Sequence, residues 1–237
     1  SAFIDDAIRA LPNFSRFKNS GLFIAERTPA SALVAREEAF ISNLALRIPI
    51  VGQGIRASER AYVTFLNKLR FDVMDDVYLG WQRSGKEITD ADMSSLSSFL
   101  NVATGRGQLG IAENLAPALS ATFFSPRLLV SRFQVPLKLL TSTPEVRKLV
   151  ARDLVAFVGT GSSILALLHA SDFADVNVDP RSSDFGKGRI GKLRYDFWGG
   201  YLPISRLVAQ LITNERQSLA SKNIVGLDRD VTVARFI

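Results

Sequence analysis

The sequence contains no cysteine and a single histidine, His169. The lack of cysteine excludes disulfide bonds, thiolate nucleophiles, zinc ribbons and iron–sulfur clusters. One histidine cannot build a two- or three-histidine metal site, and His169 lies in an apolar run, where packing or a helix-end role is the expected use. We therefore predict no catalytic residue, no metal, no cofactor and no small-molecule substrate.

Motifs that bind nucleotides or metals elsewhere are incomplete here. Residues Gly105–Gly110 match the dinucleotide fingerprint letter for letter, but they follow a predicted helix and no strand, so we interpret them as a turn between helices. Residues Gly159–Ser163 lack the Gly-Lys-Ser/Thr ending of a phosphate loop. Asp179, Asp184 and Asp196 leave two readings open, a magnesium or calcium site and, as the commoner use, capping of a loop.

The composition is that of a folded protein. Of the 237 residues, 47% are hydrophobic and 22% are charged, which allows one large domain or two small ones. The opening Ser-Ala-Phe-Ile and the closing Val-Ala-Arg-Phe-Ile have no capping or terminal character. We therefore expect an internal or processed fragment.

Apolar residues recur mainly at the three- and four-residue spacing of amphipathic helices. Helices are predicted for residues 28–49, 58–81, 89–103, 143–170 and around 207–212, with a break at residues 51–54. Two short strands around Gly191-Lys192 predict a β-hairpin near residues 186–198. The predicted fold is mainly α, a multi-helix bundle with one small hairpin. We expect helical regions at 1–104 and 105–215, the second with the hairpin, and a linker or the start of a further segment at 216–237.

The longest uncharged stretch runs from Leu154 to Ser171, 18 residues between Asp153 and Asp172. A bilayer core needs about 17 to 25 residues of helix, so the stretch reaches the lower limit. Glycine, serine, threonine and histidine dilute it, which leaves two interpretations: a helix buried in a soluble bundle, or a helix that inserts into a membrane. The candidate packing or membrane residues are Leu154, Phe157, Gly159, Gly161, Ile164 and Leu168.

Positive charge is concentrated in the second half of the chain. Residues 1–118 carry 13 basic and 13 acidic side chains, whereas residues 119–237 carry 16 basic and 10 acidic ones, which together give the net charge of +6. Such clusters attract the phosphates of nucleic acids or lipid headgroups, and the alternative is a solvated basic face. The candidate phosphate or headgroup contacts are Arg127, Arg132, Lys138, Arg147, Lys148, Arg152, Arg181, Lys187, Arg189, Lys192 and Arg194.

Several short motifs in order resemble a recurrent segment of very large tailed-bacteriophage proteins. They are Ala103–Gly107, Phe123–Arg127, Asp179–Lys187, Arg189–Gly191, Tyr195-Asp196, Trp198–Gly200 and Arg206–Leu211, and they cover about residues 100 to 215. In that family the segment lies toward the C-terminal part of polyvalent or internal virion proteins, some of which are packaged in the capsid and ejected with DNA. None of the motifs has a catalytic meaning in that family.

The resemblance implies a structural, non-enzymatic domain of a phage internal virion or ejection protein that contributes to DNA passage through the tail or host envelope. The expected partners are other virion proteins and further copies of the chain, with DNA and the host membrane as further candidates. The expected location is the virion, in the capsid interior or tail, and then the host envelope. Two alternatives stay open: a DNA-binding or protective accessory domain, and a metal-dependent enzyme that uses the loop from Asp179 to Asp196.

Overall fold

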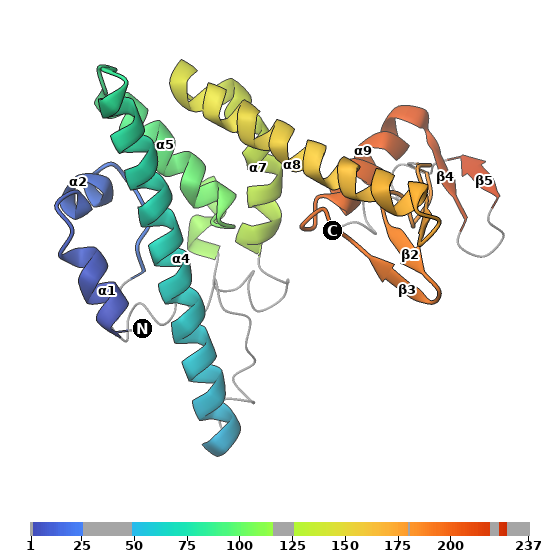
Figure 1. The fold of residues 1–237 in the computed structure, drawn as a ribbon, viewed down its shortest axis with the longest axis horizontal. Coiled ribbons are helices and arrows are strands. Elements are labelled where there is room, and N and C mark those ends of the chain that lie inside the picture. The colour runs from blue at the N-terminus through green and yellow to red at the C-terminus, as the bar shows by residue number, and fades with distance from the viewer. Residues whose placement is uncertain (1, 26–48, 116–125, 180, 219–222, 227–237) are drawn as a thin grey trace. The chain divides into compact units, whose positions relative to one another are not determined.

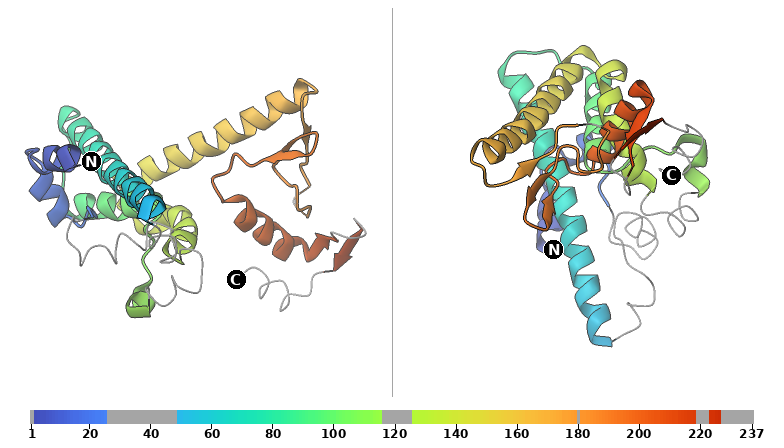
Figure 2. Two further views of the ribbon diagram at one scale, coloured as in Figure 1. Left: turned by 90° about the horizontal axis from the view of Figure 1, so that it is seen from below. Right: turned by 90° about the vertical axis from the view of Figure 1, so that its right-hand side faces the viewer.

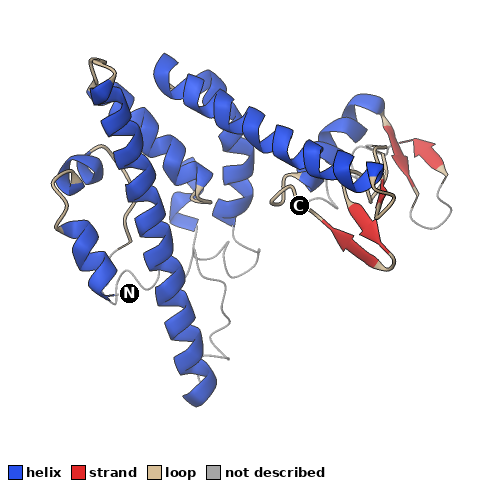
Figure 3. Cartoon of the chain, in the orientation of Figure 1, coloured by secondary structure: helices blue, strands red, loops and turns tan. Residues whose placement is uncertain are grey.

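The computed structural model describes residues 2–25, 49–115, 126–179, 181–218 and 223–226. In these ranges the chain forms seven α-helices, a 3-10 helix and five short strands (Figure 1), which confirms the mainly α class. All the strands lie in the C-terminal part of the chain (Figure 3). The chain divides into two compact units, residues 1–152 and 153–237, whereas the sequence analysis placed its boundaries after residues 104 and 215.

The longest helix of the first unit is α4, Pro49–Arg83. The predicted break at residues 51–54 is wrong, because α4 continues through it. Proline suits the first turn of a helix, and a glycine within a helix costs only about 1 kcal/mol relative to alanine. Helices α1, Ala2–Arg9, and α2, Phe14–Asn19, lie beside α4 (Figure 1). The helix predicted for residues 28–49 falls almost wholly outside the described residues.

The core of the first unit forms where α2, α4 and α5 meet. Phe17 is fully buried, and its ring lies 5.2 Å from that of Phe71 and 5.6 Å from that of Tyr78. Helix α5, Asp90–Ala103, begins with a capping box, in which the Thr89 side chain accepts a hydrogen bond from the Asp92 N–H and the Asp92 carboxylate accepts one from the Thr89 N–H. This reciprocal arrangement satisfies two backbone donors that a helix start leaves open.

Residues Gly105–Gly110 connect α5 to the 3-10 helix Gly110–Leu115, as the predicted turn requires. Gly107 marks a close crossing with α7, Pro126–Thr141, because its N–H donates to the Arg127 carbonyl at 3.1 Å. A Cβ atom on Gly107 would lie 2.5 Å from that carbonyl oxygen. The glycine-rich turn therefore serves close backbone packing.

Helix α8, Pro144–Ala170, begins in the first unit and is one uninterrupted helix in both views of Figure 2. The Thr143 hydroxyl donates to the Asp92 carboxylate at 2.8 Å, and the Thr143 N–H donates to Ser95 Oγ at 3.1 Å. Val146 and Val150, one turn apart, have no exposed surface. These contacts fix the first two turns of α8 in the core of the first unit, and the uncharged stretch follows.

The second unit contains a three-stranded antiparallel sheet in the order β1-β2-β3. Strands β2, Gly188–Ile190, and β3, Leu193–Tyr195, form the predicted hairpin, while β1, Asp175–Val176, is an edge strand that the sequence analysis missed. Helix α9, Leu202–Thr213, follows the sheet. Strands β4, Glu215–Gln217, and β5, Ile224–Gly226, pair antiparallel. Apart from Glu215 they lie in residues 216–237, the part expected to be a linker or the start of a further segment.

Candidate functional site

One side of the uncharged half of α8 packs against other residues of the second unit, to which this half of the helix belongs. The residues on this side recur at three- and four-residue spacing, as one face of a helix requires. They are buried or half-buried: Leu154, Phe157, Gly161, Ile164, Leu165 and Leu168. The structure thus brings together five of the six candidate residues of the sequence analysis, whereas Gly159 is exposed.

The other side of the same helix is exposed and apolar. Val155, Val158 and Leu167 are 72%, 51% and 71% exposed. Small residues lie exposed between them: Ala156, Gly159, Thr160, Ser162, Ser163, Ala166 and Ala170. Among the described residues, α8 is the one helix long and apolar enough to cross a membrane, and only 11% of its most apolar 18 residues are buried. It is therefore not the covered core helix that the first interpretation of the uncharged stretch requires.

The contact between α8 and the second unit centres on Trp198, whose indole lies against two glycines. A Cβ atom on Gly161 of α8 would lie 3.0 Å from Trp198 Cζ3, and one on Gly186 would lie 3.0 Å from Trp198 Nε1. The indole N–H donates to the Gly186 carbonyl at 2.8 Å. Because both neighbours lack a side chain, the indole fits between helix and loop. We call this arrangement the Trp198 contact.

Aromatic rings extend the Trp198 contact along α8. The Phe157 ring lies 6.0 Å from the Trp198 ring in an edge-to-face arrangement and 5.5 Å from the Tyr201 ring. Further along the helix, a Cβ atom on Gly188 of β2 would lie 3.1 Å from Leu168 Cδ1. Edge-to-face pairs add about 0.5–1.5 kcal/mol to the burial of the rings. Of these residues, the sequence predicted a packing role for Phe157, Gly161 and Leu168, but it did not indicate their partners.

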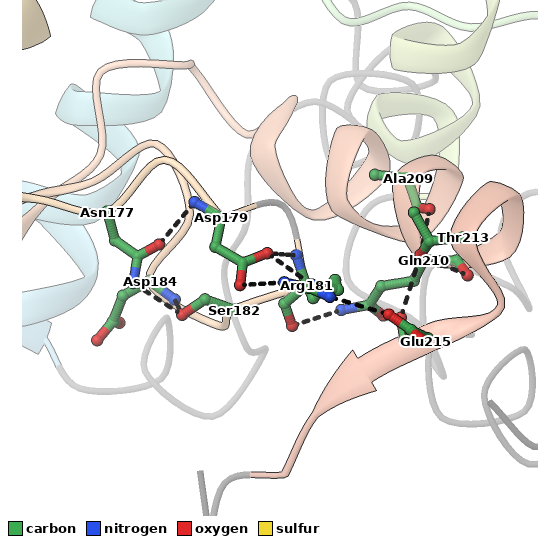
Figure 4. Close-up of polar contacts among 9 residues, drawn as sticks. All are labelled: Asn177, Asp179, Arg181, Ser182, Asp184, Ala209, Gln210, Thr213 and Glu215. Carbon is green, nitrogen blue, oxygen red and sulfur yellow. Dashed lines mark hydrogen bonds and ion pairs between the residues drawn. The ribbon is translucent and has the colours of Figure 1, made fainter. Parts of the chain in front are cut away.

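Arg181 lies at the centre of a group of polar contacts in a loop of the second unit (Figure 4). Its guanidinium donates to Asp179 Oδ1 at 2.9 Å and to Glu215 Oε2 at 2.9 Å. Its backbone carbonyl accepts hydrogen bonds from the Gln217 N–H at 3.0 Å and from the Gln210 side chain at 3.3 Å. The guanidinium beside Asp179 holds the pKa of that carboxyl below its ordinary value of 3.8. Arg181 therefore joins the loop to α9 and β4.

The acidic residues of this loop form ion pairs with basic residues of the same unit. A polar cavity of about 600 Å³ is lined in part by Asp175, Asp179 and Asp184. Arg189 forms an ion pair with Asp175, and Arg194 Nε lies 2.9 Å from Asp184 Oδ1. In the part of the chain that the structure describes, no three His, Asp or Glu side chains gather as a metal ion requires. The geometry favours loop capping over a magnesium or calcium site.

The candidate basic residues do not form one free patch. Six of the eleven take part in ion pairs with nearby carboxylates: Arg127, Lys148, Arg181, Lys187, Arg189 and Arg194. Of the others, Lys138 is half-buried and donates to Ser98 Oγ at 2.7 Å, and burial lowers its pKa.

Arg127 is the most deeply buried of these cations. Its side chain is 8% exposed, and its guanidinium lies 2.6 Å from the Glu113 carboxylate, whose pKa it lowers. An arginine held in this way supports the fold and is not accessible to phosphate.

A smaller group of basic residues lies on α8 directly before the uncharged stretch. Arg147, Lys148 and Arg152 are exposed there, while Arg132 is half-buried on α7 and Lys192 is exposed at the hairpin turn. The candidate basic residues therefore lie in separate places on α7, on α8 and at the hairpin turn. Only the group on α8 is next to the exposed apolar side.

No protein-family model, no curated protein and no solved structure matches this chain. The feature that sets its described surface apart is the half-exposed, uncharged part of α8 from Leu154 to Ala170. Any functional assignment has to explain why this surface carries no charge.

Proposed function

We propose that this chain is a non-enzymatic structural domain of a phage internal virion protein, one that is ejected with the DNA and contributes to its passage through the tail or host envelope. One observation carries the proposal: the 17 consecutive uncharged residues of α8 from Leu154 to Ala170 form a mainly apolar stretch of helix that is exposed along one side. An apolar surface left exposed on a folded unit marks a site of interaction with protein or membrane. The resemblance of residues 100–215 to phage virion proteins supplies the biological setting.

The intermediate hydrophobicity of α8 suits a protein that is folded in water inside the particle and later contacts a bilayer. Serine, threonine and glycine between the apolar residues keep α8 below the hydrophobicity of a permanent membrane span. The location we propose is therefore the virion, in the capsid interior or tail, and afterwards the host envelope. The partners are other virion proteins, further copies of the chain and the host membrane.

The DNA-binding alternative receives less support from the geometry. Proteins that bind DNA through its backbone need cations free to displace counterions from phosphates. Arg127, Arg181 and Arg189 instead form ion pairs within their own units. The enzyme alternative has no metal-binding group among the described residues.

Three experiments test the proposal. Flotation of the purified 237-residue chain with vesicles of bacterial lipid composition should bring the protein to the top of the gradient. A gel-shift series with duplex DNA is the parallel measurement: tight, salt-sensitive DNA binding without flotation would favour the accessory DNA-binding domain. Mass spectrometry of purified particles of the source phage should detect the chain, and its absence would contradict a virion role.

A further inference from the structure

An apolar groove of about 570 Å³ lies in the first unit, between the start of α1 and the N-terminal half of α4. Phe65 and Leu69 of α4 are 61% and 38% exposed, and Ile4 of α1 is 39% exposed. The apolar residues that line the groove are Ile4, Ala57, Ala61, Phe65 and Leu69. We call this surface the α4 groove. Apolar surface left exposed on a folded unit marks a site of interaction.

We propose that the α4 groove binds the chain's own residues 28–48 as an amphipathic helix that runs antiparallel to α4. These residues lie outside the described ranges, and their sequence predicts a helix that begins at Thr28-Pro29. The apolar residues of that helix recur at helical spacing: Leu33, Val34, Phe40, Ile41, Leu44 and Ile48. An amphipathic helix that lays its apolar face into a groove is a recurrent mode of binding.

The described residues on either side of the segment define its path. The Ala25 N–H donates to Asn67 Oδ1 of α4 at 2.9 Å, and the Ala25 carbonyl accepts a hydrogen bond from Asn67 Nδ2 at 3.2 Å. The chain then has to return to Pro49, the first residue of α4. Helix α4 rises by about 27 Å between Pro49 and Asn67, and a helix of residues 28–48 rises by about 30 Å. The segment therefore has the length to run back along α4.

Charge complementarity supports the antiparallel direction. When the helix of the segment begins level with Asn67, its equal rise per residue brings Glu37 within one turn of Arg60. Arg60 is exposed and lines the α4 groove. The other two charged residues of the groove lie next to each other, with Lys68 Nζ 2.6 Å from Asp72 Oδ2. The groove therefore offers a cation where the segment carries a carboxylate.

The absence of cysteine allows a test by site-specific cross-linking of the full chain. Val34→Cys with Ala61→Cys places two thiols at the same level of α4, one in the segment and one in the groove. The control pair is Ser42→Cys with Ala61→Cys, because Ser42 lies about 12 Å further along the segment and on its polar side. A short bismaleimide should join the first pair within one chain about tenfold faster than the control pair.

Phe65→Ala tests the same binding without a cross-linker. If residues 28–48 cover the groove, the substitution removes a buried ring and should lower the melting temperature by about 6 °C or more. The control is Phe3→Ala, since Phe3 is 83% exposed on α1 and does not line the groove. That control should change the melting temperature by less than about 2 °C.

The outcomes distinguish the occupants of the groove. A cross-link between two chains, which increases with protein concentration, overturns this inference in favour of a second copy of the chain. Equal cross-linking rates for the two cysteine pairs, with equal melting temperatures for the two alanine variants, show that the groove is open and overturn it as well. Vesicle flotation tests the proposed function of α8 separately, so neither result bears on that proposal.

Discussion

Two glycines of α8, two residues apart, offer a matched test of the Trp198 contact. A Cβ atom on Gly159 would have no neighbour within 4 Å, whereas one on Gly161 would lie 3.0, 3.1 and 3.3 Å from three atoms of the Trp198 ring. Alanine is favoured over glycine in a helix by about 0.8–1.0 kcal/mol. Gly159→Ala should therefore stabilise the second unit by about 1 kcal/mol.

Gly161→Ala raises helix propensity by the same amount, but its new methyl group would lie too close to the Trp198 indole. Extra atoms in a well-packed site cost about 1–3 kcal/mol. Gly161→Ala should therefore lower the free energy of unfolding by between about zero and 2 kcal/mol. The free energies of unfolding of the two alanine variants should then differ by about 1–3 kcal/mol. For a unit of this size, 1 kcal/mol corresponds to a shift in melting temperature of about 4–8 °C.

Trp198 fluorescence provides the assay. Trp81 is the only other tryptophan, so a Trp81→Phe background isolates the signal of the second unit during urea unfolding. The emission maximum of the folded Gly161→Ala protein should also move, because its indole has to shift by a few tenths of an ångström. Equal stabilisation by both alanine substitutions, with no change in emission, would show that Trp198 does not lie against Gly161.

Three further predictions concern the first unit. Thr89→Ala removes the capping box of α5 and should lower the free energy of unfolding by about 1 kcal/mol in chemical denaturation. Glu113→Gln leaves the charge of the buried Arg127 side chain without a counter-ion and should cost about 1–3 kcal/mol, whereas Arg127→Met leaves the half-exposed Glu113 to be solvated by water and should cost less. Burial raises the pKa of Asp92, but hydrogen bonds from Thr143 and Thr89 outweigh it and lower the pKa below 3.8. The stabilisation from Asp92 should therefore be complete above pH 3.8 and be lost as the pH falls through the folded-state pKa, so melting temperatures that do not fall with acidification would contradict it.

Local signals in the sequence predicted the elements that local interactions build. Thr89 with Asp92 predicted the start of α5 because capping involves residues three apart. The continuous helical pattern from Thr143-Pro144 to Ala170 predicted α8, and Gly191-Lys192 predicted the hairpin turn. The break expected near residues 51–54 failed for a related reason: glycine lowers helix propensity only slightly, and α4 continues through it.

The missed features depend on residues far apart in the chain. Strand β1 has two residues, too few to show an alternating pattern. The sequence predicted a phosphate or headgroup contact for Arg181, but Glu215, 34 positions later, accepts one of its hydrogen bonds. The Trp198 contact joins residues 161, 186 and 198, and a single sequence does not reveal which aromatic ring fills the space beside a helical glycine.

Gly159 and the uncharged positions around it are not explained by the described contacts of α8. A Cβ atom at Gly159 would contact nothing within 4 Å, and alanine would favour the helix. A helix side that only met water would gain solubility from charged residues at exposed positions, yet Val155, Ala166 and Leu167 are exposed and uncharged. Both features agree with the proposed interaction of this side of α8 with a partner that excludes charge.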